Sequence, residues 1–249
     1  MKKLILLLTL GLTLTLGACG SDTETVTVLT SSGYEPYEMV DTDGNLTGFD
    51  VELMEALALE VGIEIKWQDV DFDGIIASLQ SGTAEIAIAG ISPSAERALV
   101  VDFSDVYYNS EAGLTNYMLF DEGTSVTSLE DLDGLVVGAQ LGTIQAGILE
   151  EISSLYNFTV DLRTTNTQII EEINAGRIDV LVVENVVATS IMEANEGLEK
   201  VMLDYSTDSL NGNAIAFSEN SEYVELFNEA LATITENGVL AELVTKWFD

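Results

Sequence analysis

The chain has 249 residues, of which 47% are hydrophobic and 20% charged, so it can bury a core and allows one large domain or two small ones. Its 43 acidic residues against 8 basic ones and no histidine give a formal net charge of −35, which argues against nucleic-acid binding, because that affinity comes largely from Lys and Arg. The absence of histidine and the single cysteine exclude a His-rich or Cys-rich zinc site, a Ser-His-Asp triad and a Cys-His pair, so we expect no metal and no cofactor.

The chain begins with the features of an export signal. Lys2 and Lys3 precede an apolar run over residues 4–16, which is too short to span a bilayer but has the length of a secretory signal. The run ends in Leu16-Gly17-Ala18-Cys19, which resembles the bacterial lipobox, whose cysteine receives diacylglycerol and becomes the mature N-terminus. We predict a lipoprotein signal peptide at 1–18 and a lipidated tether at 19–25. The alternative is an ordinary signal in which Cys19 happens to lie near the cleavage point.

From residue 26 onward, short β-branched runs alternate with amphipathic stretches. The pattern predicts strands at 26–30, 63–67 and 86–89, an extended segment at 112–119, and helices at 47–61 and 74–80. We predict that Thr47 caps the first helix, because Asp50 follows it in capping-box spacing.

The alternation is repeated in a second unit that begins near Leu129. Here the pattern predicts strands at 135–139, 159–162, 179–183, 198–203 and 214–217, and helices at 144–155, 167–175, 186–194, 223–235 and before 248, with a loop at 204–212. Strands that alternate with helices favour an α/β protein with largely parallel sheets.

The loop after the strand at 86–89 has residue types suited to ligand binding. Ligands of open α/β sheets bind beyond the carboxyl ends of the strands. Gly90 allows close backbone approach, Ser92 and Ser94 offer hydroxyls, and Arg97 offers a planar fork for a carboxylate. The alternative is that Arg97 forms a structural ion pair with Glu96 or Asp102.

Two more strand ends have polar residues of this kind. Gly142 and Thr143 precede a helix, so backbone N–H groups there are suited to an anion. Glu184 follows a buried strand, where an acid is costly unless it meets a cation or hydrogen-bond donors, and a ligand ammonium group would serve. The alternative is that Glu184 caps the helix from Val186, a role for which Asn185 competes.

Loop aromatics complete a possible pocket. Tyr34 and Tyr37 flank Pro36 after the first strand, and Phe72 follows the second strand. Each could instead pack in the core. Together with Arg97 and Glu184, they describe a site for a small zwitterion, with a fork for its carboxylate, an acid for its ammonium group and aromatic faces for its side chain.

Several segments follow one another in a specific order and spacing: GYEPYE at 33–38, GNLTGFDVEL at 44–53, AGISPSAER at 89–97, VDFSDVYY at 101–108, GAQLGT at 138–143, AGRID at 175–179 and KWF at 246–248. In these segments the sequence resembles the bacterial extracellular solute-binding proteins for polar amino acids, the receptors of ABC importers, over essentially the whole mature chain. The resemblance implies a two-lobed, type II periplasmic-binding-protein-like α/β fold with ligand between the lobes. It places lobe 1 at 26–110 and 212–249 and lobe 2 at 111–211, joined by two crossing strands.

The resemblance also implies roles for individual residues. Arg97 is expected to bind the ligand α-carboxylate, helped by the N–H groups of Ser92 and Thr143. The Gly90 carbonyl, the Ser92 hydroxyl and Glu184 are expected to bind the α-ammonium group.

The ligand side chain is expected to lie between the rings of Tyr34 and Phe72. Ser31 stands where some relatives that bind basic or amide side chains carry an aspartate, which weakens the expectation of lysine or arginine without excluding either. Gln140 could supply an amide. Glu184 is one methylene longer than the family's frequent aspartate, and Ala95 replaces a usual proline while Pro93 lies two residues earlier.

The function implied is that of an amino-acid receptor that closes over its ligand and delivers it to a membrane permease with its ATPase. We expect a monomer that is exported and anchored by lipid to the outer face of the cell membrane, or periplasmic. One alternative is a dehydratase of cyclic carboxylic acids on the same fold, with Glu184 as its acid or base. Another is an amino-acid sensor without a transporter. The choice of amino acid stays open at this level.

Overall fold

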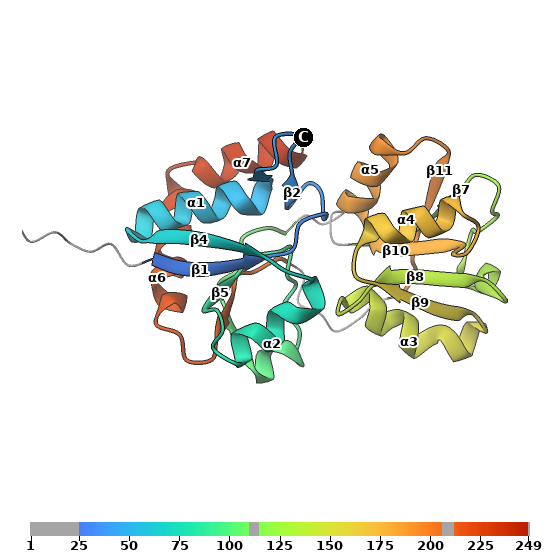
Figure 1. Ribbon diagram of the computed structural model, residues 1–249, viewed down its shortest axis with the longest axis horizontal. Coiled ribbons are helices and arrows are strands. Elements are labelled where there is room, and N and C mark those ends of the chain that lie inside the picture. The colour runs from blue at the N-terminus through green and yellow to red at the C-terminus, as the bar shows by residue number, and fades with distance from the viewer. Residues whose placement is uncertain (1–24, 110–114, 206–211, 249) are drawn as a thin grey trace, which may run out of the picture.

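The computed structural model describes residues 25–109, 115–205 and 212–248, and its first sheet has the strand order β4-β1-β5-β12-β6 (Figure 1). These strands span Glu64–Asp69, Thr25–Thr30, Ile86–Ala87, Ala216–Ser218 and Val101–Phe103, in that order. β1 pairs in parallel with β4 and β5, and β12 pairs antiparallel to β5 and β6. The first lobe is therefore built from both ends of the described chain.

The second sheet has the order β11-β7-β10-β8-β9 and is built from the middle of the chain (Figure 1). Its strands span Leu198–Met202, Asn116–Asp121, Val180–Glu184, Val136–Gln140 and Thr159–Arg163, in that order. β8 pairs in parallel with β9 and β10, and β7 pairs antiparallel to β10 and β11. The predicted two-lobed α/β architecture is confirmed, and each sheet also contains antiparallel strands.

Helices cover both faces of each sheet. On the first lobe they are α1 (Phe49–Val61), α2 (Ile75–Gln80), α6 (Tyr223–Glu236) and α7 (Val239–Phe248); on the second they are α3 (Ile144–Tyr156), α4 (Asn166–Asn174) and α5 (Asn185–Ala194). Side chains alternate between the faces of a strand. Val28 accordingly packs with Leu57 of α1, whereas Leu29 packs with Leu79 of α2. Both faces are apolar because both are covered.

Shorter elements connect these layers. They are the hairpin of β2 (Met39–Val40) and β3 (Leu46–Thr47) and the 3₁₀ turns η1 (Phe72–Gly74), η2 (Arg97–Leu99) and η3 (Leu129–Leu132). η1 and η2 follow strands of the first sheet on the side that faces the second lobe, and they place Phe72 and Arg97 there.

The predicted capping box of α1 is wrong. Thr47 belongs to β3, and the N-cap position is Gly48, with no side-chain cap hydrogen bond. A Cβ atom at Gly48, whose φ is 133°, would lie 2.2 Å from the Tyr37 carbonyl oxygen, so close packing of two backbone segments requires glycine. Asp50 is fully buried and accepts hydrogen bonds from distant residues instead of its own helix.

The two connections between the lobes run side by side where they leave the first lobe. The N–H of Tyr107 donates to the Asn213 carbonyl, and the N–H of Asn213 donates to the Tyr108 carbonyl, each at 2.9 Å. Residues 110–114 and 206–211, which contain the predicted lobe boundaries, lie outside the described residues. The predicted signal peptide, Cys19 and most of the tether lie outside them as well.

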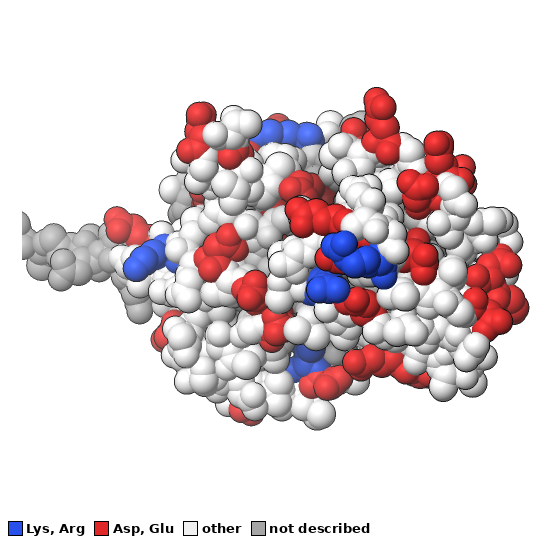
Figure 2. Space-filling view, turned by 45° about the vertical axis from the view of Figure 1, so that its right-hand side comes forward, with Lys and Arg blue, Asp and Glu red and all other residues white. Residues whose placement is uncertain are grey.

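Acidic side chains are spread over both lobes on the face shown in Figure 2, and they outnumber the basic ones there. Mutual repulsion among such charges opposes the compact state, and salt screens it. Among the described residues, no helix combines the length and the apolar character that crossing a membrane requires.

Candidate ligand-binding site

A cavity lies between the two lobes, and residues of both lobes line it. Its lining contains every residue for which the family resemblance implies ligand contact: Ser31, Tyr34, Phe72, Gly90, Ser92 and Arg97 from the first lobe, and Gln140, Thr143 and Glu184 from the second. Ile144 and Gln145 also line it and were not predicted. Ser94 is not part of this lining, and its hydroxyl accepts from the Arg97 N–H at 3.2 Å. The space between these side chains amounts to about 350 Å³, part of it open to solvent. The ligand contacts themselves stay predictions.

Arg97 joins the lobes through its guanidinium group. Its Nη1 donates to the Ser92 carbonyl at 2.7 Å, within its own loop, and its Nη2 donates to the Gly142 carbonyl at 2.9 Å, in the other lobe. The ion pairs found among the described residues do not include Arg97, so the alternative of a pair with Glu96 or Asp102 is not realised there. Burial lowers the pKa of Arg97, which nevertheless stays a cation because a guanidinium loses its proton only at very high pH.

The N-terminus of α3 faces the same space. Thr143 is the N-cap of α3, and its hydroxyl accepts from the Ala146 N–H at 3.2 Å and donates to the Gln140 carbonyl at 2.6 Å. The N–H of Thr143 points back to that same carbonyl, at 3.3 Å. The first-turn residues Ile144 and Gln145 line the cavity, and first-turn N–H groups have no acceptor within their helix. This helix end and the Arg97 guanidinium carry the kind of donors that suit a carboxylate.

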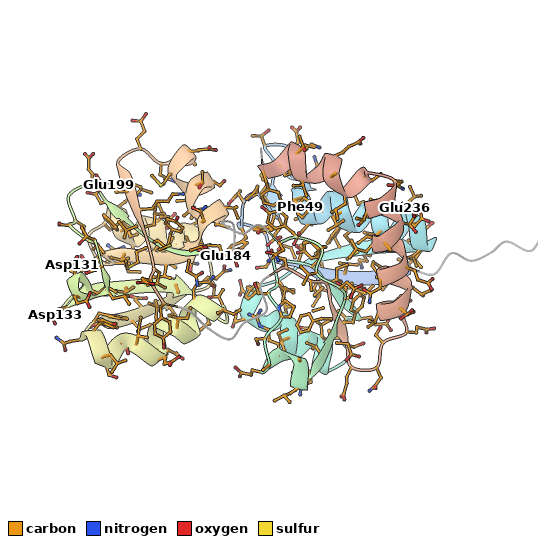
Figure 3. The ribbon with its side chains drawn as sticks, turned by 180° about the vertical axis from the view of Figure 1, so that it is seen from behind. Phe49, Asp131, Asp133, Glu184, Glu199 and Glu236 are labelled. Atoms are coloured by element: carbon orange, nitrogen blue, oxygen red, sulfur yellow. The ribbon has the colours of Figure 1, made fainter. Side chains whose placement is uncertain are left out.

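Glu184 lies at the end of β10, on the side of its lobe that faces the first lobe (Figure 3). Glu184 is 5% exposed, and its Oε2 atom has no hydrogen-bond partner among the described residues. Burial raises the pKa of Glu184 to about 8, and the charge of Asp50 adds to the effect, whereas the Gln145 amide and the Arg97 charge lower it. An uncompensated buried acid is costly unless a cation completes the site.

The capping alternative for Glu184 is not realised. The helix begins at Asn185, so Glu184 holds the N-cap position, but its side chain makes no capping hydrogen bond. Asn185 accepts from the Lys200 ammonium group at 2.8 Å through its side-chain oxygen. Glu184 therefore does not serve as a helix cap, and it lines the cavity.

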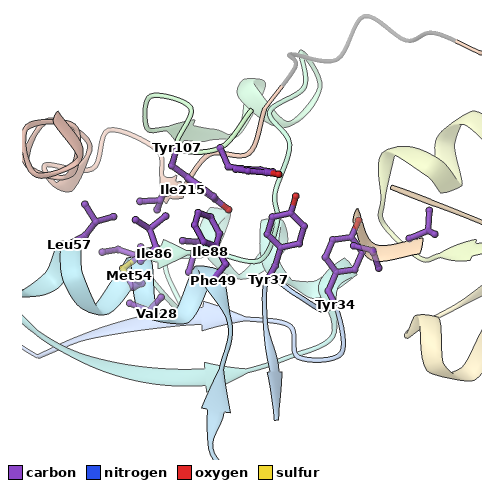
Figure 4. Packing of buried hydrophobic residues seen from close by; sticks show 14 of the residues in the cluster. Val28, Tyr34, Tyr37, Phe49, Met54, Leu57, Ile86, Ile88, Tyr107 and Ile215 are labelled. Atoms are coloured by element: carbon purple, nitrogen blue, oxygen red, sulfur yellow. The ribbon is translucent and has the colours of Figure 1, made fainter. Parts of the chain in front are cut away.

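The aromatic residues divide between core and cavity. Tyr37 is fully buried in the first lobe, and its hydroxyl donates to Asn213 Oδ1 at 3.3 Å, so it is not a contact surface. The Tyr34 ring stacks on the Tyr37 ring, with ring centroids 5.6 Å apart. Tyr34 lies beyond Tyr37 on the side toward the second lobe (Figure 4). The Arg97 guanidinium lies 5.5 Å from the ring centroid of Phe72. Tyr34 and Phe72 thus line the cavity from the first lobe.

Gly90 is held in place by residues that the sequence did not indicate. Its N–H donates to Asp50 Oδ2 at 2.6 Å, and its carbonyl accepts from Asn213 Nδ2 at 2.7 Å. Its φ is 55°, and a Cβ atom there would lie 3.0 Å from the Tyr34 ring. The sequence pattern predicts a helix-capping role for Asp50 and shows no motif around Asn213, so only their long-range contacts reveal the part they play here.

The neutral polar residues that line the cavity differ in how far their hydrogen-bonding groups already have partners in the protein. Gln140 is buried and donates through Nε2 to the Thr164 carbonyl at 3.0 Å, which leaves its amide oxygen to accept. Gln145 donates to Asn116 Oδ1 at 2.8 Å. Ser31 is 5% exposed at the end of β1. The cavity thus offers one cation, one carboxyl group, two aromatic faces and neutral polar groups.

The chain is similar in sequence and in fold to known amino-acid-binding proteins. The chain is 38% identical to the arginine-binding extracellular protein ArtP of Bacillus subtilis, over 100% of this chain and 98% of that protein. It superposes with a TM-score of 0.82 on an ancestral arginine-binding protein bound to arginine, at 32% identity over 90% of this chain and 98% of that one. The amino acid ABC transporter substrate-binding protein AbpA of Streptococcus pneumoniae, bound to L-arginine, gives a TM-score of 0.81 at 30% identity, over 90% and 94% of the two chains.

The residues that line the cavity come from both lobes and from segments far apart in the chain, so no single motif makes the site. The family model of bacterial extracellular solute-binding proteins, family 3, matches residues 26–249. The match spans both lobes and the connections between them. The chain therefore belongs to the bacterial extracellular solute-binding proteins of family 3.

Proposed function

We propose that this protein binds a cationic amino acid, L-arginine above all, in the cavity between its lobes. The observation that carries the proposal is the placement of Arg97 and of the buried carboxyl group of Glu184, which has an oxygen without a partner among the described residues, around one cavity. The ligand α-carboxylate binds at Arg97 and the N-terminus of α3, and its α-ammonium group binds at Glu184. Both contacts are charge-assisted, and each contributes about 1.5–3 kcal/mol.

The choice of a cationic side chain rests on the cavity walls and on the relatives named above. Tyr34 and Phe72 offer aromatic faces on which a planar guanidinium stacks. The overall charge of −35 attracts cations. Because Ser31 carries no charge, stacking and neutral hydrogen bonds hold the side-chain end. We therefore expect a modest preference for arginine over glutamine.

Calorimetric titration of the protein with each common amino acid tests this proposal. The expected result is one-to-one binding of L-arginine, weaker binding of lysine and glutamine, and no binding of glutamate or aspartate. Equal affinity for arginine and glutamate would overturn the assignment, since the cavity offers an acidic side chain no second cation.

We also infer that the protein serves an ABC importer from the outer face of the membrane, held there through lipid on Cys19. The lipobox-like residues 16–19 and the extracellular family support this inference. Labelling of producing cells with radioactive palmitate is expected to mark the wild type and not Cys19→Ala. Arginine uptake by those cells should require a permease and its ATPase, and it should be lost in Arg97→Ala. Arginine uptake that persists without any ABC permease would contradict the transport role.

Finally, we infer that the protein is not an enzyme. An acid with a raised pKa, such as Glu184, could serve acid–base chemistry, but binding of an ammonium group also explains it. The relatives named above are binding proteins. Incubation with prephenate or arogenate is expected to give no product, and turnover would favour the dehydratase alternative.

A further inference from the structure

Asp50 is a buried acid that the proposed ligand contacts leave unexplained. It lies in the first turn of α1 and is fully buried, as is its neighbour Glu38. A buried carboxylate is costly, because its hydration is lost, so its presence requires compensating hydrogen bonds. Asp50 Oδ2 accepts from the Gly90 N–H at 2.6 Å and from the Tyr107 hydroxyl at 2.8 Å.

The first of these hydrogen bonds reaches the cavity wall. Gly90 lines the cavity, and its two peptide groups are fixed from opposite sides, the N–H by Asp50 and the carbonyl by Asn213 Nδ2. A carbonyl oxygen has two lone pairs, so this carbonyl keeps one for a ligand donor. Without Asp50, the N–H of Gly90 would lose its hydrogen-bond acceptor. That hydrogen bond supports the left-handed conformation of Gly90, whose φ is 55°.

The charge state of Asp50 affects the strength of its hydrogen bond from Gly90. Burial raises the pKa of Asp50 to about 7, and it raises the pKa of Glu38 well above its usual range, where the charge of Asp50 adds to the effect. Because the two carboxyl groups are buried next to each other, a negative charge on one disfavours a negative charge on the other. A charge on Asp50 makes its hydrogen bond from Gly90 stronger than a neutral one.

We propose that Asp50 is a positioning residue for the ligand ammonium group, acting through the backbone of Gly90. Asp50 holds the Gly90 peptide so that its carbonyl oxygen meets the ammonium group together with Glu184. This inference rests on the proposed function, because it requires an amino acid in the cavity. It adds a residue behind the cavity wall, 40 positions from Gly90 in the chain.

The test compares L-arginine with its deamino analogue, in which hydrogen replaces the α-ammonium group. The ratio of their dissociation constants measures the ammonium contact alone. In Asp50→Ala, the preference of the full-length protein for arginine is expected to fall about tenfold or more, consistent with a charge-assisted hydrogen bond. In Asp50→Asn, whose amide oxygen can accept both hydrogen bonds, the preference is expected to stay within about threefold of wild type.

Tyr107→Phe is the matched control. It removes the other hydrogen bond to the same Asp50 oxygen and leaves the Gly90 hydrogen bond in place. The melting temperature is expected to fall while the preference for arginine stays within about twofold. If Asp50→Ala does not fold, Asp50→Ser takes its place, because its hydroxyl is too short to hold both partners.

Two results overturn the proposal: an unchanged preference in Asp50→Ala or Asp50→Ser, or an equal loss of preference in Tyr107→Phe. Either result, with a wild type that binds arginine, refutes only this inference. A wild type that binds no amino acid refutes the proposed function, and the role of Asp50 with it.

Discussion

Replacing Glu184 by glutamine separates what this side chain costs the fold from what it contributes to binding. Glutamine has nearly the same shape but carries no charge and no titratable proton. In the wild type, burial raises the pKa of Glu184 from its ordinary value of 4.5 to about 8. The folded protein therefore holds a proton on Glu184 at pH values where the unfolded chain has already released it.

The sign for stability follows from this difference. The state that binds more protons loses relative stability as pH rises, so Glu184 destabilises the fold progressively between about pH 4.5 and pH 8. The gap between these two values corresponds to about 5 kcal/mol at most, reached above pH 8. We expect Glu184→Gln to raise the free energy of unfolding of the ligand-free protein by a few kcal/mol at pH 8 and by almost nothing at pH 4.5.

Binding changes in the opposite direction. An ammonium group favours the ionised carboxylate, so ligand binding releases a proton whenever Glu184 is protonated beforehand. With a pKa of about 8, the wild-type affinity should rise up to about fifty-fold between about pH 6 and pH 8. Glu184→Gln should bind arginine about ten to a hundred times more weakly at pH 8, consistent with the loss of one charge-assisted contact. Its affinity should barely depend on pH.

Urea denaturation at several pH values, together with calorimetry in buffers of different ionisation enthalpy, measures both effects. Proton release on binding should approach one per ligand at about pH 7 in the wild type and vanish in the variant, because Glu184 is mostly protonated there. Asp179→Asn is the control, since Asp179 accepts a backbone N–H from Val136 at 2.7 Å, outside the cavity lining. A variant that is no more stable than wild type at pH 8 and keeps the proton release would refute the reasoning.

Three further experiments test other parts of the site and of the surface. Arg97→Ala should weaken arginine binding by about ten- to a hundredfold, as calorimetry would show. Arg97→Lys should restore only part of the affinity, because the planar fork is lost. Unchanged affinity in Arg97→Ala would exclude Arg97 from the carboxylate contact. Gly142→Ala should weaken binding, because the φ of Gly142 is 79° and the added Cβ would lie 2.8 Å from Asp73 Cα in the other lobe. The control is Gly147→Ala, whose Cβ would meet nothing within 4 Å, so it should stabilise α3 by about 0.5–1 kcal/mol and leave binding unchanged. Equal affinities in the two variants would argue against a contact between the lobes at Gly142. The melting temperature should rise between low and molar salt, because screening weakens repulsion within a chain of net charge −35, and a flat salt profile would contradict that account.

Much of the fold follows from local sequence patterns. Alternating apolar runs and amphipathic stretches predicted the strands and helices, and they located β8, α3 and β10 to within about two residues. The same patterns placed Gly90, Gly142 and Glu184 after strands. Because strand ends of parallel sheets meet at one edge, this order alone predicted that such residues face a common site.

The sequence could not decide which partner each polar side chain meets. Asp50 stands in capping-box spacing, yet the close approach of Gly48 to Tyr37 places the helix start differently, and Asp50 meets Gly90 instead. Tyr34 and Tyr37 are three positions apart in one loop, yet one lines the cavity and the other fills the core. Arg97 stands near several acids in the chain but bonds to two backbone carbonyls.

There is a physical reason why the sequence predicts the elements and not the partners of the polar side chains. Propensity and apolar periodicity act over a few neighbouring residues, so the sequence by itself determined the elements, the strand-end loops and the strong excess of acid. A hydrogen-bond partner or a burial state depends on segments brought together by folding. Asn213 and Asp50 support the site only through contacts that span 123 and 40 positions of the chain, so the tertiary structure alone decided their place.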